Sequence, residues 1–570
     1  MPRALAQCRT NDGLRGYQSH EARRILAVAT LIVRWLVMRY DDWFLTSEER
    51  GNPMTEIDAH RSGGAAWTEG NHVAFLIEGV SYFNRLVDII SILEPHDEIR
   101  FADWRGDADE RVSRDGTSIA ALVAHACRRG VDVRGLLWRS HSDRFGFNSQ
   151  QNRRLAIEVT EAGGEVLLDE RVRRGGSHHQ KMVLIRHPSR LDRDVAFIGG
   201  IDLSHGRRDD SGHSGDSQAI KLDPRYGHRP PWHDVQLEIR GPTIAELDLT
   251  FRERWEDPTP LNHSGRLRAL LSRTMSRDRV TRPLPAPLAV PATQGGHAVQ
   301  VLRTYPSRRP KYSFAPDGER SVARAFAKAI TRARTVIYIE DQYFWSVEIA
   351  RLLAEVLRQQ PKLQVIGVVP RYPDKDSKWA GPPSRLAQAR AIAIVKEAGG
   401  DRVGIYDIEN EVDTPIYVHA KVCVIDDVWA TVGSDNLNRR SWTHDSELSC
   451  AVIDSELDER IPLDPGGLGD GSRKFARALR LSLWAEHLGR SPDDPELLNL
   501  SHSSVLWRKV SEELEVWRAS PDGEHRPAIR IRPHVIDPVP GGNRGWAGLA
   551  YRLVFDPDGR PLKLRLRRGF

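Results

Sequence analysis

Hydrophobic and polar positions along the chain follow the same order twice. In the first half a strand-like run from residue 98 precedes a helical pattern at 118–129, a second run from 131 and a helix from 152. In the second half, runs from 335 and 363 alternate with helical patterns at 346–359 and 384–398. Alternating strands and helices predict an α/β fold with a mainly parallel sheet flanked by helices in each half. The repetition predicts a pseudo-twofold duplicated body.

Composition places the boundaries between the parts. The stretch RPLPAPLAVPATQGG, from residue 282, is dense in proline and cannot be a continuous helix, so we place the boundary between the halves there. Residues 203–232 lack hydrophobic periodicity and are predicted to form a long loop, of the kind that often covers a site. We expect an N-terminal extension at 1–70, similar halves at 71–285 and 286–520, and a C-terminal tail with β-like pieces at 521–570.

Composition and charge narrow the classes of protein to which this chain can belong. Of the 570 residues 40% are hydrophobic and 28% charged, which is typical of a globular protein and not of a disordered one. The net charge of +5 gives only a mild preference for anionic partners, phospholipid surfaces and nucleic acids alike. The four cysteines lie far apart, which argues against a metal cluster of short spacing and a dense disulfide framework. We expect a cytoplasmic protein with reduced thiols.

One apolar segment, residues 25–38, raises the question of membrane insertion. It contains Arg34 and is too short to cross a bilayer, and it lacks the flanks of a cleaved signal peptide. We therefore expect a core or amphipathic helix, with an interfacial anchor as the alternative.

Two histidine–lysine pairs stand at matching places in the repeat. His179 and Lys181 lie in SHHQKMVLI, and His419 and Lys421 lie in YVHAKVCVI. Side chains two apart on a strand project to the same side, so each pair can address one anion. One such pair would be unremarkable, but two pairs in a duplication indicate a site between the halves. The turn GSDN, from Gly433, is either a plain hairpin connection or a donor of hydrogen bonds to phosphate.

These residues resemble the signature of the phospholipase D superfamily, His-x-Lys, four residues, Asp, then six residues to Gly-Ser-x-Asn. The second copy matches at every position, including Asp426, Ser434 and Asn436. The segments HHQK, GGIDL, PWHDV, IYIEDQYF and SLWAEHLG resemble the phospholipid-cleaving branch. The first copy departs from the pattern, because Arg186 occupies the aspartate position and HPSRLDRD is inserted, within which Asp192 or Asp194 is a candidate substitute.

The resemblance implies roles for these side chains. His179 would be the nucleophile that forms a phosphohistidine, and His419 the acid that later activates water. Asp426 would complete the catalytic set, while Asp234 and Glu447 would orient the imidazoles. Lys181 and Lys421 would neutralise the charge of the substrate phosphate, and Ser434 and Asn436 would donate hydrogen bonds to it. No metal and no other cofactor is expected.

The expected activity is hydrolysis of glycerophospholipids to phosphatidic acid and a free head group, with head-group exchange following from the covalent step. The alternatives are a phosphatidyltransferase or a nuclease of the same superfamily, and a noncatalytic lipid-binding homologue in which the first copy has degenerated. The expected partner is a phospholipid membrane surface, at which the protein would be peripheral. Nucleic acid is not expected, since no basic stripe interleaved with aromatics is found, and no obligate protein partner is expected.

Overall fold

A computed structural model describes residues 39–59, 61, 63–139, 149–261, 281–374, 381–520, 525–536, 544–567 and 570. The helix expected at 25–38 lies outside these residues. Within the described ranges no helix is both long enough and apolar enough to span a membrane.

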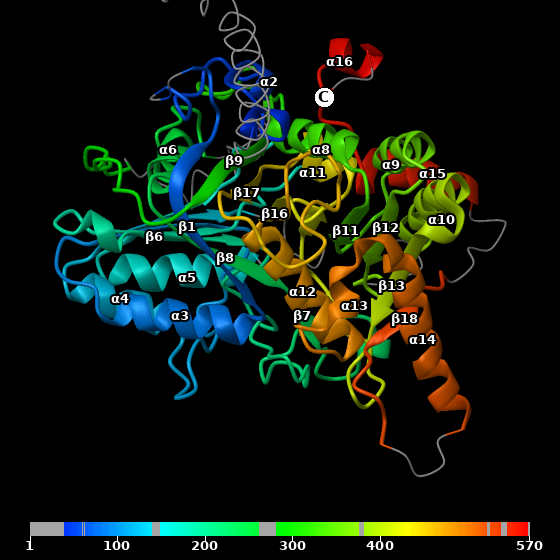
Figure 1. Ribbon diagram of the computed structural model, residues 1–570. Coiled ribbons are helices and arrows are strands. Elements are labelled where there is room, and N and C mark those ends of the chain that lie inside the picture. The colour runs from blue at the N-terminus through cyan, green and yellow to red at the C-terminus, as the bar shows by residue number, and fades with distance from the viewer. Residues whose placement is uncertain are drawn as a thin grey trace, which may run out of the picture.

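One sixteen-stranded sheet runs through both halves (Figure 1). The first half contributes the strand order β4-β3-β2-β5-β6-β8-β1, and the second continues it as β9-β17-β16-β15-β11-β12-β13-β18, with β10 beside β9. The strands of the first half are β1 (Thr68–Ile77), β2 (Glu98–Asp103), β3 (Asp132–Trp138), β4 (Glu165–Asp169), β5 (Met182–Arg186), β6 (Val195–Gly199) and β8 (Val235–Arg240). Those of the second are β9 (His297–Tyr305), β10 (Glu319–Arg320), β11 (Val336–Glu340), β12 (Gln364–Val368), β13 (Val403–Ile408), β15 (Val422–Ile425), β16 (Trp429–Gly433), β17 (Glu447–Asp454) and β18 (Ile531–Pro533).

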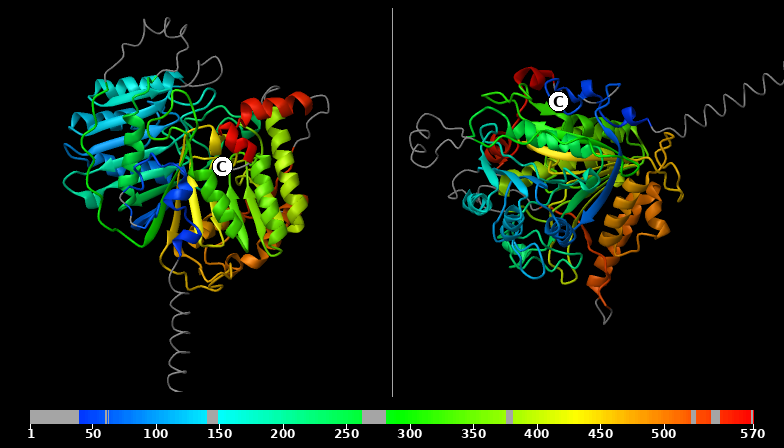
Figure 2. Two further views of the ribbon diagram at one scale, coloured as in Figure 1. Left: turned by 90° about the horizontal axis from the view of Figure 1, so that it is seen from above. Right: turned by 90° about the vertical axis from the view of Figure 1, so that its left-hand side faces the viewer.

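The strand orders of the two halves mirror each other about the antiparallel pair β1 and β9, in which Asn71 lies opposite His297. The halves therefore lie side by side around a pseudo-twofold axis (Figure 2), which confirms the predicted duplicated α/β body. The sheet is mixed, however, where a mainly parallel one was expected. Only β2-β3-β4 and β11-β12-β13 are parallel runs. The strands that follow the lysines, β5 and β15, return by short connections and so pair antiparallel with their neighbours.

Helices cover both faces of the sheet. The helices are α3 (Gly79–Ser91), α4 (Ile119–Arg128), α5 (Ser149–Glu161) and α6 (Thr243–Trp255) in the first half, and α8 (Ser321–Arg332), α9 (Val347–Gln359), α10 (Gly381–Gly399), α12 (Lys474–Leu488) and α14 (Ser503–Ala519) in the second. Successive residues of β11 enter different cores. Tyr338 packs near Trp484 and Trp507 of α12 and α14, whereas Ile337 and Ile339 belong to the core that includes α8 and α9. This two-sided burial explains why the strand is apolar at every central position.

The C-terminal tail differs from its predicted β character. Among the described residues of the tail, only β18 is a strand, and it pairs antiparallel with β13. The chain then forms α15 (Arg544–Ala550), a π-helix at Tyr551–Phe555 and α16 (Leu562–Arg567). Residues 281–296, where the boundary between the halves was placed, form no helix or strand.

Candidate active site

A small parallel pairing brings the two halves together at the second histidine. β7 (Trp232–His233), from the first half, pairs with β14 (Tyr417–Val418), from the second. The backbone amide of His419 donates to the carbonyl of His233 at 2.8 Å. The first histidine is held in the same way, because the amide of His179 donates to the carbonyl of Ser446 at 2.9 Å. Each histidine is therefore anchored to a segment of the opposite half.

The side-chain contacts cross between the halves in the same sense. Nδ1 of His179 lies 2.8 Å from Oε2 of Glu447, and Nδ1 of His419 lies 2.7 Å from Oδ2 of Asp234. Glu447 follows Ser446 and Asp234 follows His233. In each case, therefore, the residue after the anchoring carbonyl supplies the carboxylate that contacts the same histidine. With Nδ1 engaged in both rings, Nε2 is the nitrogen left for chemistry. The two carboxylates stand where the sequence placed the orienting groups, but each serves the histidine of the other half.

Electrostatics show that the two pairs form one cluster. Burial, followed by the charges of Lys181 and Lys421, holds the pKa of His179 well below its ordinary value. The pKa of His419 is held down by burial, then by Lys421, Arg207 and Lys181. Because each lysine acts on both imidazoles, the four groups share one low-dielectric region, in which neutral imidazoles are favoured.

The lysines are almost completely buried. Nζ of Lys181 donates to the carbonyl of His179 at 3.2 Å, and Nζ of Lys421 donates to the carbonyl of His419 and lies 3.5 Å from Oε1 of Gln342. Burial lowers the pKa of both ammonium groups, that of Lys421 to about 8. Two buried ammonium groups therefore stand beside two neutral imidazoles, and an anion placed between them would stabilise their charge.

In the turn after β16, the hydroxyl of Ser434 has other hydrogen-bond partners than the phosphate expected from the sequence. The hydroxyl of Ser434 donates to Oε2 of Glu447 at 2.6 Å and accepts from the amide of Leu448 at 3.0 Å. It therefore supports the carboxylate that orients His179 and is not directed at a phosphate. The Oδ1 atom of Asn436 is buried and has no partner among the described residues.

The structure separates Asp426 from the catalytic cluster, which corrects its expected catalytic role. It follows β15, so its carboxylate is about five residues and roughly 16 Å along the strand from Lys421. Its oxygens accept from the backbone amides of Arg334 at 2.7 Å and of Thr335 and Val336 at 2.8 Å. This aspartate fixes the start of β11 and has no contact with the histidines.

The first half replaces that aspartate by an ion pair. Nε of Arg186 donates to Oδ2 of Asp194 at 2.6 Å, while Oδ1 of Asp194 accepts from the amide of His187. The substitute suggested by the sequence, Asp194, thus compensates the arginine charge at the far end of β5. Asp192 lies in the short helix at Leu191–Arg193 and is not part of this pair.

Three side chains near the histidines were not singled out as site residues. The indole of Trp232 lies 4.9 Å from the ring of His419, centroid to centroid, and the guanidinium of Arg207 lies 4.0 Å from the Trp232 ring. Arg207 also donates to Asp202 at 2.9 Å. Trp232 and Asp202 lie in motifs noted in the sequence, PWHDV and GGIDL, whereas Arg207 lies in the aperiodic loop and left no signal there.

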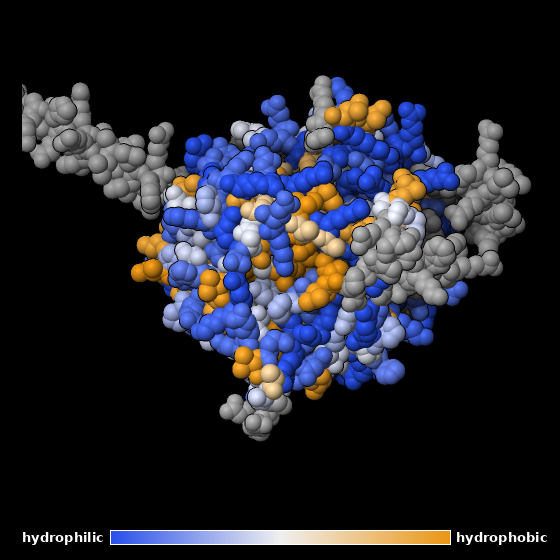
Figure 3. Space-filling model, turned by 90° about the vertical axis from the view of Figure 1, so that its right-hand side faces the viewer, coloured by the Kyte–Doolittle hydropathy of each residue, from blue (hydrophilic) through white to orange (hydrophobic). Residues whose placement is uncertain are grey.

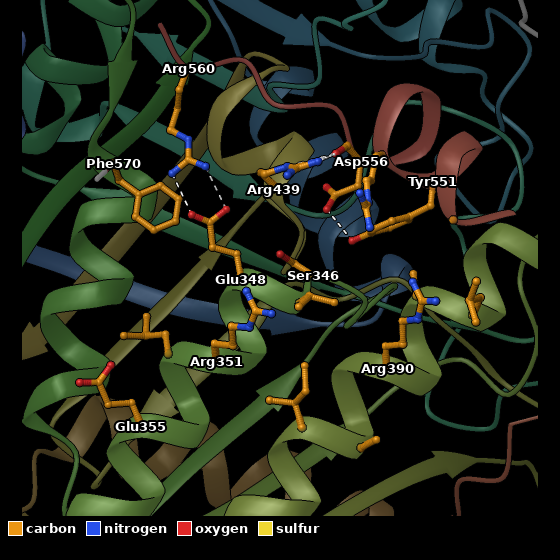
Figure 4. A pocket seen from close by; sticks show the side chains of 18 of the residues that line it. Ser346, Glu348, Arg351, Glu355, Arg390, Arg439, Tyr551, Asp556, Arg560 and Phe570 are labelled. Atoms are coloured by element: carbon orange, nitrogen blue, oxygen red, sulfur yellow. Dashed lines mark hydrogen bonds and ion pairs between the residues drawn. The ribbon is translucent and has the colours of Figure 1, made fainter. Parts of the chain in front are cut away.

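A separate hollow of about 1140 Å³ lies between α9, α10 and the C-terminal helices, and none of the catalytic candidates lines it. On that side of the molecule apolar residues gather around a central depression bordered by hydrophilic ones (Figure 3). Arg560 forms a two-pronged pair with Glu348, and Asp556 accepts from Tyr551 (Figure 4). Because Asp556 also accepts from the amide of Arg440 at 2.7 Å, the C-terminal segment braces the turn that carries Asn436.

A cluster of histidine and glutamate side chains lies behind the second histidine. Glu78, His213, His233 and Glu486 each offer one ligand atom, and these atoms all lie within 4.8 Å of one another. The sequence predicts no metal site, because it contains no ligands at the short spacings typical of one. These four residues come from four separate segments, so no spacing could reveal them.

Comparison with known proteins shows which families the sequence resembles. A family model described as "Phospholipase D" matches residues 121–350, and one described as "Cardiolipin synthase, PLD-like domain" matches residues 326–461. Phospholipase D alpha 1 of Cynara cardunculus is 25% identical over 434 residues, which cover 59% of this chain and 52% of that protein. Phospholipase D gamma 1 of Arabidopsis thaliana is 24% identical, over 80% of this chain and 67% of that one. The chain therefore spans about half to two thirds of the length of these relatives.

Among solved structures, the phosphatidylserine synthase of Haemophilus influenzae aligns with a TM-score of 0.43 and 13% identity, covering 67% of this chain and 82% of that one. The two family matches overlap at residues 326–350 and together span residues 121–461, so that each includes one of the histidine–lysine pairs. This chain belongs to the phospholipase D superfamily.

Proposed function

We propose that the protein is a phosphodiesterase of the phospholipase D type, which hydrolyses glycerophospholipids to phosphatidic acid and a free head group. The observation that carries this proposal is the crossed pair of imidazole–carboxylate contacts, His179 with Glu447 and His419 with Asp234. Two oriented imidazoles and two buried ammonium groups supply a nucleophile, an acid and positive charge, which are the three requirements of phosphodiester cleavage.

The first step forms a phosphohistidine. Nε2 of His179, neutral because its pKa is depressed, attacks phosphorus, and the bond from phosphorus to the head-group oxygen breaks. The leaving oxygen takes a proton from Nε2 of His419. This imidazole is also neutral in the free protein, so it must gain its proton when the phosphate anion enters and offsets the charges of Lys181 and Lys421.

The second step reverses the roles at the same atoms. His419, now neutral, takes a proton from water, whose oxygen attacks phosphorus while the bond to Nε2 of His179 breaks. Phosphatidic acid leaves, and the initial proton count is restored. A primary alcohol can replace water at this point, so head-group exchange is part of the proposal.

The nonbridging oxygens require positive charge and donors throughout. Lys181 and Lys421 supply the charge, and the side-chain amide of Asn436 is the remaining donor of the turn, since the hydroxyl of Ser434 is engaged with Glu447. Arg207 would add positive charge at the same site, because its guanidinium lies 4.0 Å from the ring of Trp232, which packs against His419.

A phosphatidyltransferase is the second candidate. It is favoured by one observation, the match of residues 326–461 to the domain described for cardiolipin synthase. The two activities share the phosphohistidine and differ in the acceptor, water or a lipid alcohol. We propose hydrolysis first, because the relatives that cover most of this chain are named phospholipases D.

The test is release of choline from phosphatidylcholine vesicles by the full chain and by His179→Ala and His419→Ala. We expect both variants to lose activity, and ethanol to divert part of the wild-type product to phosphatidylethanol. Wild-type turnover that persists in either variant would contradict the shared site. If the wild type produces only lipid–lipid transfer, with no free phosphatidic acid, the transferase is the correct reading.

A further inference from the structure

The histidine–glutamate cluster behind His419 has the arrangement of a metal site. Nε2 of His213 lies 2.7 Å from a carboxylate oxygen of Glu486 and 3.7 Å from one of Glu78. Nδ1 of His233 contacts the same oxygen of Glu78. Two imidazole nitrogens and two carboxylates therefore converge on one point, contributed by the end of β1, the long loop, β7 and α12.

The nitrogens that face away from this point are also engaged. Nδ1 of His213 lies 3.0 Å from the carbonyl oxygen of Trp232, and Nε2 of His233 lies 2.8 Å from Oε2 of Glu340. The other oxygen of Glu340 lies 2.8 Å from Nε2 of His487. Metal-binding histidines almost always donate their second N–H to a carbonyl or a carboxylate, which fixes the tautomer that presents the other nitrogen as a ligand. Both histidines here meet that condition.

The buried carboxylates of the cluster have only imidazoles as positively charged partners among the described residues. Glu78 and Glu340 are buried and Glu486 nearly so, yet no lysine or arginine in the described part of the chain forms an ion pair with any of them. Oε2 of Glu78 is fully buried and has no hydrogen-bond partner within those residues. Buried carboxylates require nearby positive charge, so either protonated imidazoles or a bound cation must supply it.

We propose that Glu78, His213, His233 and Glu486 bind one divalent transition-metal ion, of which zinc fits the donor set best. Two imidazoles and two carboxylates match the ligand types and the coordination number of four that zinc prefers, whereas calcium and magnesium prefer oxygen ligands alone. With all four positions filled by protein, the ion has a structural role and does not contact the phosphate.

The position of the site explains what the ion would do. The carbonyl of His233 accepts from the amide of His419, and the next residue, Asp234, orients the imidazole of His419. An ion on His233 fixes the short strand that carries both contacts and ties it to α12. The long loop contributes His213 and is thereby fastened to the same point.

The proposal is tested by metal content and not by activity alone. The full chain is purified, dialysed against chelator, and reconstituted with zinc, calcium or magnesium before metal analysis. We expect about one zinc per chain, retained after gel filtration, no retained calcium or magnesium, and a higher melting temperature with zinc. Cobalt in place of zinc should give the intense visible absorption of a four-coordinate site.

Matched variants locate the ion. His213→Gln and Glu486→Gln should each lose the bound zinc and the zinc-dependent rise in melting temperature. His534→Gln is the control, because His534 is also a buried histidine beside a carboxylate, 3.1 Å from Asp407, and lies outside the cluster. It should retain zinc.

Two results would overturn the proposal. One is wild-type protein that holds no zinc and shows no cobalt absorption after reconstitution, which would leave protonated imidazoles as the balancing charge. The other is zinc retained in both cluster variants. Neither result bears on the proposed phosphodiesterase activity, which is measured separately with choline release.

Discussion

Replacing Glu447 by glutamine tests the crossed geometry directly. The variant keeps the size of the side chain and removes the charge that faces Nδ1 of His179, at 2.8 Å in the wild type. Glutamine can present either its oxygen or its amide nitrogen to the ring, so the tautomer with Nε2 free is no longer enforced. We expect kcat/KM for choline release to fall while the fold is retained.

The size of the effect follows from the lost contact. A hydrogen bond to a charged group contributes about 1.5–3 kcal/mol, and 1.36 kcal/mol corresponds to a factor of ten, so the loss is about 10- to 150-fold. If the ring also changes tautomer, the loss approaches ~10⁴-fold, as for the corresponding change in a serine protease. Stability should change little, because glutamine keeps the size of the side chain and its oxygen can still accept from the hydroxyl of Ser434.

The assay separates the two histidines by step. Rapid-quench measurement of phosphoenzyme and choline is made for Glu447→Gln and for its counterpart Asp234→Asn. Glu447→Gln should slow formation of the phosphohistidine on His179. Asp234→Asn weakens the support of His419, which serves in both steps, so it should slow both formation and hydrolysis.

The control is Glu456→Gln, which changes an exposed glutamate paired with Lys474 at the surface and should leave all rates unchanged. Wild-type kinetics in Glu447→Gln would refute the orienting role. Slowing of both steps in Glu447→Gln, together with a selective loss of formation in Asp234→Asn, would mean that His419 and not His179 is the nucleophile.

Three further predictions concern the lysine charge and the ends of the repeated strands. Burial lowers the pKa of Lys421 to about 8, so its positive charge is present below that pH and lost above it. We therefore expect kcat/KM to fall above about pH 8. In Lys421→Arg this alkaline fall should disappear from the pH profile, because arginine keeps its charge. Asp426→Ala leaves three backbone amides without acceptors and should lower the free energy of unfolding in urea by at least about 2 kcal/mol, with kcat of the folded fraction unchanged; a selective loss of kcat would restore a catalytic role. Arg186→Met leaves the buried carboxylate of Asp194 unpaired and should cost about 3–5 kcal/mol in the same experiment, most of it recovered when Asp194→Asn is added; no recovery would show that the pair is not what stabilises this strand end.

The repeat made much of this architecture predictable. Period-two patterns predicted the strands β5 and β15, which begin directly after Lys181 and Lys421, and the duplication predicted that both lysines would reach one site. No local pattern in the sequence shows which segments, far apart in the chain, lie next to each other in the fold. Glu447 was recognised as an orienting carboxylate, but its partner, His179, lies 268 positions away and in the other half.

The mixed sheet and the histidine–glutamate cluster could not be predicted from the sequence for related reasons. A strand has the same periodicity whether its neighbour runs parallel or antiparallel, so the direction of β5 and β15 could be read only from the shortness of their connections. His213 lies in a loop without periodicity, and Glu486 lies on α12 at the other end of the sequence. Their proximity depends on where that loop folds, which is a tertiary property.

The departure of the first copy from the family signature has a structural explanation. Arg186 lies opposite Glu98 at the end of β5, the position that corresponds to Asp426 after β15. At that end of the second half Asp426 accepts hydrogen bonds from backbone amides, roughly 16 Å along the strand from Lys421, which we propose binds the phosphate. A residue with that task can be exchanged once another group balances it, and the insertion supplies Asp194 at 2.6 Å. The histidines and lysines have no such freedom, because each contributes an atom or a charge to a site that needs both halves.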